Sequence, residues 1–444
     1  MHDQFGLISV LYAVLLVLMN TAALSVLARR TTWLPGVAWL LFNYSWMVVS
    51  NIVLEGERQY ITEQMRYSLA NGATLLLLGY TALFLAGYFI GAAVLDRYVK
   101  RAESRLPSFR LGDRVVTRKQ TETAVFWIIV ATLLVLIGHA LVSGSPVFNR
   151  SVITQQHFWD DAARVPALAK VYSQLPAVAF AFAVVSTSIK RTLIVVVLCI
   201  VSLALVGDNF SAMFFTTYFG LFRALQHLNL RSVITPRAIA GAAAFVSLFV
   251  WLTIMGYQSE GRQESAAINF MFYRSLVLQG HVWWGLVDYV REFGPVGDAW
   301  HLLENDGMDT AMKIVAPASI YGRFAEGGGR FTGAYPGVLH LSFGAGAMVL
   351  QVLVGALFAF VVLTFHYVAR LGFVCAFLAA KVFQYVIIFL VMGDSGRLFA
   401  LNPAVYSMLL MFFVLMAVWL RSQRFGQSAG GRCRVGIARS EGVR

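Results

Sequence analysis

The stretch "LGFVCAFLAAKVFQYVIIFLVM", from Leu371 to Met392, decides the class of fold. A helix needs about 20 mostly apolar residues to cross the hydrocarbon core of a membrane, and this stretch supplies them. It carries one charged residue, Lys381, near its middle. An ionisable side chain at that depth is rare and is by default a functional-site hypothesis. We therefore expect a membrane-spanning helix here, with Lys381 as a candidate site residue.

The whole chain shares this apolar character. Of its 444 residues, 59% are hydrophobic and 13% are charged, whereas soluble globular chains are about half apolar and about a quarter charged. The composition therefore predicts an all-α polytopic membrane protein. The three cysteines lie in apolar stretches or in the C-terminal tail, so no disulfide framework is expected.

About eleven segments are long and apolar enough to be predicted as membrane spans. They cover residues 6–27, 34–54, 69–95, 122–143, 168–188, 192–207, 210–226, 238–256, 337–365, 371–392 and 401–420. The sixth and seventh are short and separated only by "GDN" (Gly207–Asn209), so a single hairpin or a distorted pair is the alternative there. The first span is interpreted as a retained helix, because no Lys or Arg precedes it.

Lys and Arg concentrate in alternate connections, which predicts the orientation of the chain. These connections hold Arg29 and Arg30, eight basic residues from Arg97 to Lys119, and six more from Arg421 onward. We expect them on the cytoplasmic side, with the N-terminus outside and the C-terminus inside. The basic loop at 96–121 is expected to lie on anionic lipid; binding to nucleic acid or to a cytoplasmic partner is the alternative. No nucleic-acid partner is therefore predicted from the net charge of +13.

This topology divides the chain into four parts. Residues 1–256 hold the first eight spans and the basic loop, 257–336 form an external loop, 337–420 hold the last three spans, and 421–444 form a basic cytoplasmic tail. Unstructured connections as long as the external loop are uncommon and usually functional. The loop has six basic and nine acidic residues, so its arginines would act locally and not through a general positive field.

The external loop contains the polar stretch "YRSLVLQGHVWWGLVDYVREFG", from Tyr273 to Gly294. On one continuous helix, its polar residues and a glycine notch share a face: Arg274, His281, Gly285, Asp288 and Glu292. The opposite face is apolar and is expected to lie against lipid or protein, and its tryptophans suit the headgroup region of a membrane. We therefore predict an amphipathic interfacial helix; a surface helix whose polar side only faces water is the alternative.

A second cluster, "YGRFAEGGGRFTGAYPG" from Tyr321 to Gly337, alternates arginine, aromatic residues and glycine. Its consecutive glycines leave backbone N–H groups free for an oxyanion, and its aromatic rings suit sugars. Arg323 and Arg330 are candidate ligands, with a flexible loop as the alternative. His340 follows about one turn inside the next span. It is a candidate base because imidazole titrates near neutrality; a hydrogen-bonded structural histidine is the alternative.

These features resemble the bacterial repeat-unit polymerases of the O-antigen and exopolysaccharide pathways (the Wzy type). Those multi-pass proteins carry an Arg-x10-Gly motif in large external loops, and "RSLVLQGHVWWG" from Arg274 to Gly285 fits it. The stretch "SFGAGAMVLQVLVG" from Ser342 to Gly355 is similar to the glycine-spaced helix that follows the large loop in these polymerases and in the related O-antigen ligases. In the shorter external loop, Asp161 stands where the motif following Arg150 requires glycine, so Arg150 is only a candidate, with a solvated loop arginine as the alternative.

The resemblance implies a glycosyltransferase in the bacterial inner membrane. Its substrate would be an oligosaccharide repeat on undecaprenyl pyrophosphate, polymerised at the periplasmic face into a surface polysaccharide such as O-antigen, capsule or exopolysaccharide. Sugars that arrive already activated need no cofactor. A flippase and a chain-length regulator are the protein partners that such a pathway implies.

The resemblance also implies roles for the candidate residues. Arginine binds phosphate bidentately and stays charged, so Arg274 is the first candidate for the pyrophosphate, followed by Arg323 and Arg330. The candidate bases are His340 and His281, then Asp288 and Glu292. No metal site is expected, because His281 and Asp288 are seven residues apart instead of three or four. Lys381 would neutralise a lipid phosphate or pair with a carboxylate.

Three other functions stay open at this point. A transporter or flippase for lipid-linked oligosaccharide would place ionisable groups in mid-membrane, as Lys381 is placed. An O-antigen ligase would use the same donor but transfer the glycan to a lipid A core. A membrane-anchored protein could use its external loop only to bind a partner.

Overall fold

The computed structural model describes residues 2–30, 33–57, 72–103, 118–148, 158–207, 210–226, 276–296, 307–326, 335–369 and 373–393, with residue 410 and short pieces between 236 and 273. Within these ranges the chain forms helices and no strands. Seven of the helical stretches are long and apolar enough to cross a membrane: Leu7–Arg29, Leu34–Glu55, Ala73–Asp96, Glu122–Val142, Pro166–Val185, Gly337–Phe365 and Phe373–Val391. The prediction of an all-helical, multi-pass membrane protein is confirmed at this level.

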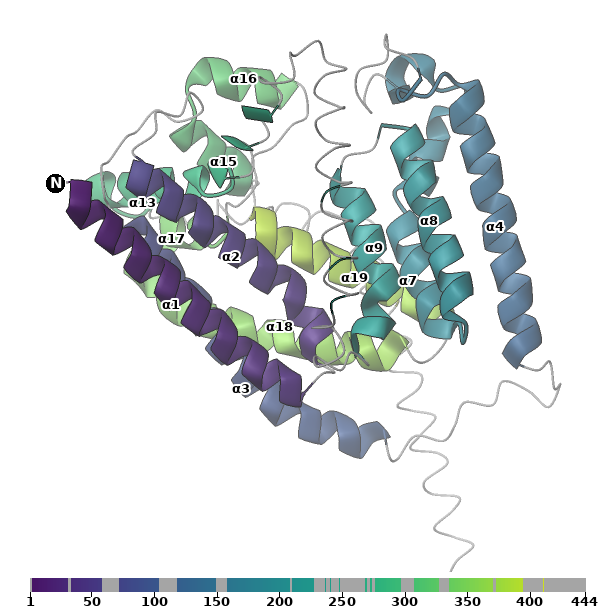
Figure 1. The fold of residues 1–444 in the computed structure, drawn as a ribbon, viewed down its shortest axis with the longest axis horizontal. Helices are drawn as coiled ribbons and strands as arrows, with labels where there is room; N and C mark the ends of the chain where they lie inside the picture. Colours follow the sequence, from purple (N-terminus) through teal and green to yellow (C-terminus); the bar gives the residue numbers. More distant parts are fainter. Residues whose placement is uncertain are drawn as a thin grey trace, which may run out of the picture.

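Figure 1 shows the described helices in two groups joined by α19 (Phe373–Met392). One group contains α1 (His2–Arg29), α2 (Leu34–Glu57), α3 (Ala73–Glu103) and α18 (Ala347–Ala369). The other contains α4 (Arg118–Val142), α7 (Leu175–Val185), α8 (Ile189–Leu205) and α9 (Phe210–Gln226). Because α19 packs against α18 and α7, one hydrophobic core extends from the first group into α7 and α9 of the second. A separate core joins α4, α7 and α8 within the second group.

Two short predicted spans correspond to described helices, and two others cannot be compared. The segments expected at 192–207 and 210–226 form α8 and α9, each 17 residues long. The segments expected at 238–256 and 401–420 lie outside the described residues. The total of eleven spans therefore stays a prediction.

The span from Pro166 to Val185 is interrupted. It begins with η3 (Pro166–Leu168) and α6 (Ala169–Tyr172), turns at Ser173 and Gln174, and continues as α7. Proline lacks the N–H that would continue the hydrogen-bond pattern of a helix, and Pro176 lies in the first turn of α7. The helix therefore breaks at a point within the apolar stretch. A short π-helical turn, η2 (Phe158–Ala162), precedes it.

Helices α3 and α18 make the closest helix contact of the first group. A Cβ atom added to Gly87 would lie 2.0 Å from the carbonyl oxygen of Val352, and one added to Gly355 would lie 2.1 Å from that of Phe84. Gly91, four residues after Gly87, meets the backbone of Ala356 in the same way. Small residues four apart allow helix backbones to approach in a membrane, where lipid provides no hydrophobic drive for association. Glycine is therefore required on both sides of this contact.

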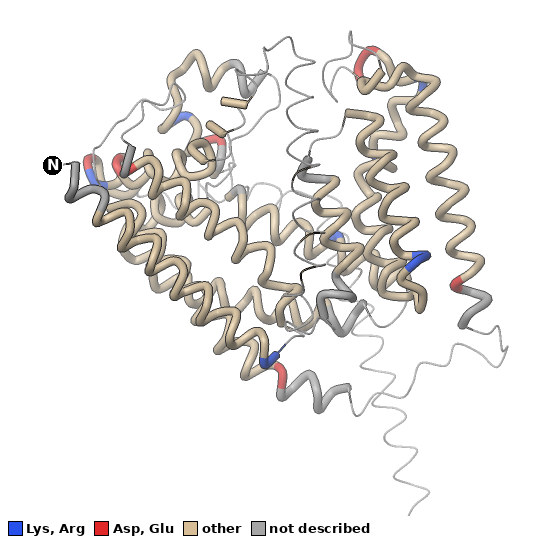
Figure 2. Tube along the Cα trace, in the orientation of Figure 1, with Lys and Arg blue, Asp and Glu red and all other residues tan. Residues whose placement is uncertain are grey.

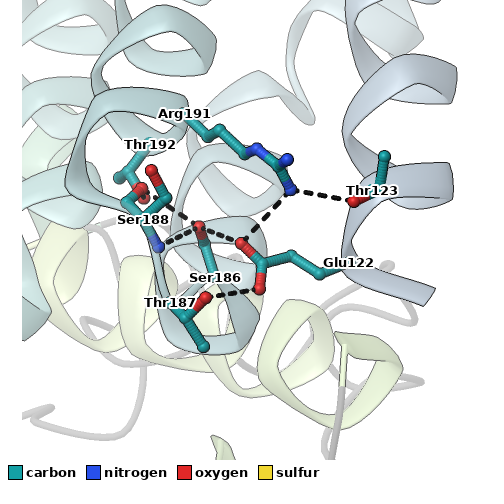
Figure 3. Close-up of polar contacts among 7 residues, drawn as sticks. All are labelled: Glu122, Thr123, Ser186, Thr187, Ser188, Arg191 and Thr192. Atoms are coloured by element: carbon teal, nitrogen blue, oxygen red, sulfur yellow. Dashed lines mark hydrogen bonds and ion pairs between the residues drawn. The ribbon is translucent and has the colours of Figure 1, made fainter. Parts of the chain in front are cut away.

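A polar network ties α4 to the turn between α7 and α8 (Figure 3). The Glu122 carboxylate, almost fully buried, accepts hydrogen bonds from Ser186 Oγ at 2.9 Å and from Thr187 Oγ1 at 2.8 Å. Arg191 lies 3.8 Å from the same carboxylate and donates to Thr123 Oγ1 at 3.0 Å. Removing one partner of such a buried group leaves an uncompensated charge. The network therefore holds the start of α4 against the start of α8.

Charged residues of the bundle lie mainly near helix ends, with long uncharged stretches between them (Figure 2). At the ends of α1 and α3, Arg30 lies 3.7 Å from Asp96. These two positions fall in connections that the distribution of Lys and Arg predicts to share one side of the membrane. Their contact agrees with that pairing of ends, while the direction of the chain across the membrane stays a prediction.

Where the structure describes the segment between α9 and α18, it shows α13 (His281–Phe293), α15 (Gly307–Val315), α16 (Ala318–Glu326) and α17 (Gly337–Phe343). Apolar side chains of α13, α15 and α17 form a separate small core. Helix α13 also contacts α2 and α3. The described part of the predicted external loop is thus a folded helical unit packed on the bundle (Figure 1).

We expect Gly87→Ala to destabilise the protein by about 1–3 kcal/mol, because the added methyl group meets backbone atoms of α18 that cannot move aside without shifting the helix. Gly138→Ala in α4 is the matched control, since a Cβ there meets no atom within 4 Å. Thermal unfolding in detergent micelles would measure both. Equal melting temperatures for the two variants would contradict the assignment of α3 and α18 as a glycine-dependent contact.

Candidate functional site

The chain turns immediately before α13. This helix begins at His281, with Gly280 as its N-cap residue, and the peptide N–H of Gly280 donates to the Val277 carbonyl at 3.4 Å. Ser50 of α2 holds this turn, since its hydroxyl donates to the Val277 carbonyl at 2.7 Å and accepts the Gly280 N–H at 2.9 Å. The prediction of one continuous helix carrying Arg274, His281, Gly285, Asp288 and Glu292 on one face is therefore wrong. Contacts with α2 break that helix at Gly280.

The first two turns of α13, from His281 to Asp288, are buried inside the protein. Trp283 and Trp284 are 0% and 2% exposed, and Trp283 Nε1 donates to the Ala73 carbonyl at the start of α3 at 2.8 Å. Gly280 lies directly against Asn51 of α2, where a Cβ would come within 2.4 Å of the Asn51 amide. Of the two expected neighbours of the apolar face, lipid and protein, the structure shows protein, so the prediction that the tryptophans lie among lipid headgroups is wrong. The tryptophans pack against protein instead.

Helix α17 brings His340 to Tyr80 of α3. The His340 Nδ1 atom lies 3.0 Å from the Tyr80 hydroxyl oxygen, which lies 3.1 Å from the Gly344 carbonyl oxygen. The ring of Trp283 packs on both residues, with centroids 5.5 Å from His340 and 5.3 Å from Tyr80. His340 is 7% exposed. We call His340, Tyr80, Gly344 and Trp283 the outer cluster; within the described structure, His340 Nε2 makes no hydrogen bond.

Two of the three other predicted bases, His281 and Asp288, are also buried on α13. His281 Nδ1 lies 2.7 Å from the Leu278 carbonyl oxygen, so it donates to its own turn. The charge of Asp288 acts on Glu55 at the end of α2, whose carboxylate accepts the Thr74 N–H at 3.2 Å. Gly285 is buried as well, instead of forming an open notch. Of the predicted α13 residues, only Glu292 is exposed.

The predicted phosphate ligands are only partly covered by the described structure. Arg274, Arg330 and Arg150 lie outside the described residues, and Arg323 belongs to α16 without a described side chain. Helix α16 is attached to α15 by Tyr321, whose hydroxyl donates to Asp309 Oδ1 at 2.7 Å. That bond to Asp309, with some burial, raises the pKa of Tyr321. Lys313 of α15 lies 2.7 Å from Asp309 and 5.4 Å from the ring centroid of Tyr321. The contacts of Tyr321 therefore hold α16, with the backbone of Arg323, against α15.

Lys381 of α19 contacts neutral oxygen atoms. Its Nζ atom lies 3.4 Å from the Ser173 carbonyl and 3.5 Å from Gln384 Oε1, with the ring of Tyr385 5.7 Å away. Ser173 is the residue at which α6 ends, and cations are favourable at helix C-termini. The alternative that Lys381 pairs with a carboxylate finds no support among the described residues. No described contact joins Lys381 to the outer cluster.

Three residues near the site were not predicted from the sequence: Tyr80, Gly344 and Glu55. Tyr80 lies in an apolar span, 260 residues from His340, and such a pairing has no local signal. Gly344 is part of a glycine-spaced stretch, and its φ of +55° is a backbone conformation that side chains disfavour. Glu55 directly follows the predicted span 34–54, and a carboxylate at that position is normally interpreted only as the end of the span. Among the described residues, no group of three or more His, Cys, Asp or Glu could hold a metal ion.

Comparison with known protein families finds a match in the C-terminal part of the chain. Residues 303–407 match a family of unknown function, DUF6418. The matched range contains α15 to α19, and therefore His340, Gly344 and Lys381, whereas Tyr80 and α13 lie outside it. No curated protein and no solved structure matches the chain. The chain is thus similar to that family over its last described helices, and the family brings no activity with it.

Proposed function

We propose that this protein polymerises oligosaccharide repeat units carried on undecaprenyl pyrophosphate, at the periplasmic face of a bacterial inner membrane. The proposal includes eleven spans, a periplasmic N-terminus and a cytoplasmic C-terminus. The observation that carries it is the outer cluster: the folded loop segment meets the bundle at a buried histidine, His340, whose Nε2 atom makes no hydrogen bond to any residue that the structure describes.

The chemistry requires a base and a group that stabilises the departing pyrophosphate. The bond between sugar C1 and the pyrophosphate oxygen breaks, and a bond forms between C1 and a hydroxyl oxygen of the acceptor repeat. The acceptor proton passes to His340 Nε2, and undecaprenyl pyrophosphate leaves. A positioned base typically contributes about 10²–10⁴-fold to a rate, so His340 is assigned this role.

The arginines of the loop are assigned to the pyrophosphate. Guanidinium groups form bidentate hydrogen bonds with phosphate and stay charged at any working pH. Arg274 is the first candidate, with Arg323 and Arg330 after it, since α16 lies in the same chain segment as α13 and α17, which carry Trp283 and His340. Loss of one preorganised donor to a developing anion costs about 3 kcal/mol of barrier.

Position within the membrane supports the same function. His340 lies one turn inside the span that begins at Gly337, where a lipid-linked pyrophosphate at the headgroup level and its first sugars meet the protein. The helical unit formed by α13, α15 and α17 covers this end of the bundle. A base at the membrane surface suits a donor that is anchored in lipid and an acceptor that projects into water.

A second candidate function is a transporter or flippase for lipid-linked oligosaccharide, and Lys381 is the observation that favours it. This lysine lies in the middle of the span Phe373–Val391 beside an interrupted helix, and both features are typical of transport pathways. A ligase that transfers the glycan to a lipid A core is the third candidate, because it would use the same donor.

Replacing His340 tests the assignment of the base. We expect His340→Gln to lower the polymerisation rate by about 10²–10⁴-fold, so that long glycans disappear while single repeats still reach the cell surface. Glycan length on gels and membrane insertion of the protein would be measured together. His139→Gln is the matched control, because His139 lies on α4 and contacts Ser143 and Trp159 instead of the outer cluster.

The same glycan analysis separates the three functions. Glycans of normal length in the His340→Gln strain would contradict the proposal that this protein is a polymerase with His340 as its base. Repeats that accumulate inside a strain lacking the protein would indicate a flippase. Long glycans that remain on the undecaprenyl carrier in that strain would indicate a ligase.

Cysteine labelling tests the orientation. In a variant without native cysteines, we expect an impermeant maleimide to label Ser319→Cys of α16 in intact spheroplasts, since Ser319 is exposed and the proposed topology assigns its segment to the periplasm. Lys190→Cys, which is exposed at the start of α8, should react only after the membrane is permeabilised. The opposite pattern would place the loop in the cytoplasm, where it could not meet the carrier-linked donor.

A further inference from the structure

We propose that Tyr80 is a positioning residue that fixes the tautomer of His340, so that Nδ1 carries the proton and Nε2 keeps its lone pair. The use of Nε2 as a base rests on the proposed function. The tautomer itself follows from the hydrogen-bond geometry of the outer cluster and holds whatever reaction the protein performs.

The protons available for the two hydrogen bonds of the Tyr80 hydroxyl determine the tautomer of His340. A tyrosine hydroxyl has one proton to donate and can also accept, whereas a carbonyl oxygen can only accept. The Tyr80 oxygen lies 3.1 Å from the Gly344 carbonyl and 3.0 Å from His340 Nδ1. Both hydrogen bonds form only if Tyr80 donates to Gly344 and Nδ1–H donates to Tyr80. The other tautomer would leave one of these buried contacts unmade, which is unfavourable.

The fold keeps the three groups in this order. Gly344 ends α17 with φ +55° and ψ −135°, and its own N–H donates to the His340 carbonyl. This backbone turn, which favours glycine, places the Gly344 carbonyl beside the Tyr80 hydroxyl. The rings of Tyr80 and His340 meet edge to face, with centroids 5.9 Å apart and planes at 87°. Trp283 packs on both rings and is anchored to the Ala73 carbonyl.

The arrangement sets which nitrogen can act as a base. Imidazole in water usually carries its proton on Nε2, so the protein reverses the ordinary preference. In catalytic histidines, one ring nitrogen commonly donates a hydrogen bond to a second group, which orients the ring and leaves the other nitrogen to act as the base. Here a carbonyl and a hydroxyl take the place of a carboxylate. Because the Tyr80 hydroxyl and the Gly344 carbonyl are neutral, this arrangement avoids the free-energy cost of burying an isolated charge near the membrane.

Nitrogen-15 NMR of histidine-labelled protein in lipid bilayers would test the tautomer directly. The chain has eight histidines, so His340 would be assigned from its loss in His340→Gln. In the wild type we expect Nδ1 at the position of a protonated nitrogen and Nε2 at that of an unprotonated one. In Tyr80→Phe we expect a shift toward the Nε2-protonated form.

Tyr88→Phe is the matched control. Tyr88 is also a buried tyrosine of α3, but its hydroxyl donates to the Trp33 carbonyl at 2.9 Å and does not touch His340. Its loss should leave the His340 resonances unchanged. A wild-type spectrum with Nε2 protonated, or identical His340 resonances in the wild type and Tyr80→Phe, would overturn the proposal. The wild-type measurement decides this even if Tyr80→Phe fails to fold.

Activity gives a second readout. We expect Tyr80→Phe to lower kcat of glycan polymerisation by about 10- to 100-fold, the range usual for groups that orient a functional imidazole, with KM little changed. Tyr88→Phe should keep kcat. A wild-type protein with the expected tautomer but no polymerising activity would contradict the proposed function alone, because the spectrum is independent of the reaction. Equal kcat for Tyr80→Phe and the wild type would overturn the positioning role.

Discussion

The close contact between α3 and α18 is the constraint on which the candidate site depends. Apolar side chains gain little by leaving lipid for protein, so helices in a membrane associate through tight packing and polar contacts. Gly87 and Gly355 let these two backbones touch. Tyr80 lies two turns before Gly87 on α3, and Gly344 leads into α18. The separation of the Tyr80 hydroxyl from the Gly344 carbonyl is therefore set by helix packing, and the orientation of His340 follows from it.

The sequence predicted those parts of the structure that hydropathy determines by itself. Length and apolarity placed the span with Lys381 and the span that begins at residue 337, and the described helices confirm both. His340 was singled out as a candidate base because imidazole titrates near neutrality and the residue lies about one turn inside a span. Its partner Tyr80 could not be found in this way, since tyrosine is common in spans and the pairing joins positions 260 residues apart. Only helix packing brings them together.

Helix α13 shows why periodicity failed where it seemed informative. A 3.6-residue pattern predicts which residues share a face only while the helix continues, and contacts of Gly280 with Ser50 and Asn51 end the helix there. The tryptophans illustrate a second ambiguity. An amphipathic pattern with aromatic residues suits a lipid headgroup region and a protein interior equally well, and Trp283 finds its hydrogen-bond acceptor on α3. Tertiary contacts decided between the two.

The protein places its two unusual membrane-embedded groups in different electrostatic settings. His340 is held by neutral donors and acceptors near the end of the bundle, whereas Lys381 contacts the carbonyl freed by the break between α6 and α7. An anion at the outer cluster would therefore gain little from Lys381, which is committed to stabilising a helix end. The outer cluster itself contains no positive charge. The proposed function therefore assigns the stabilisation of the departing pyrophosphate to arginines of residues 257–336, in line with the Arg-x10-Gly resemblance.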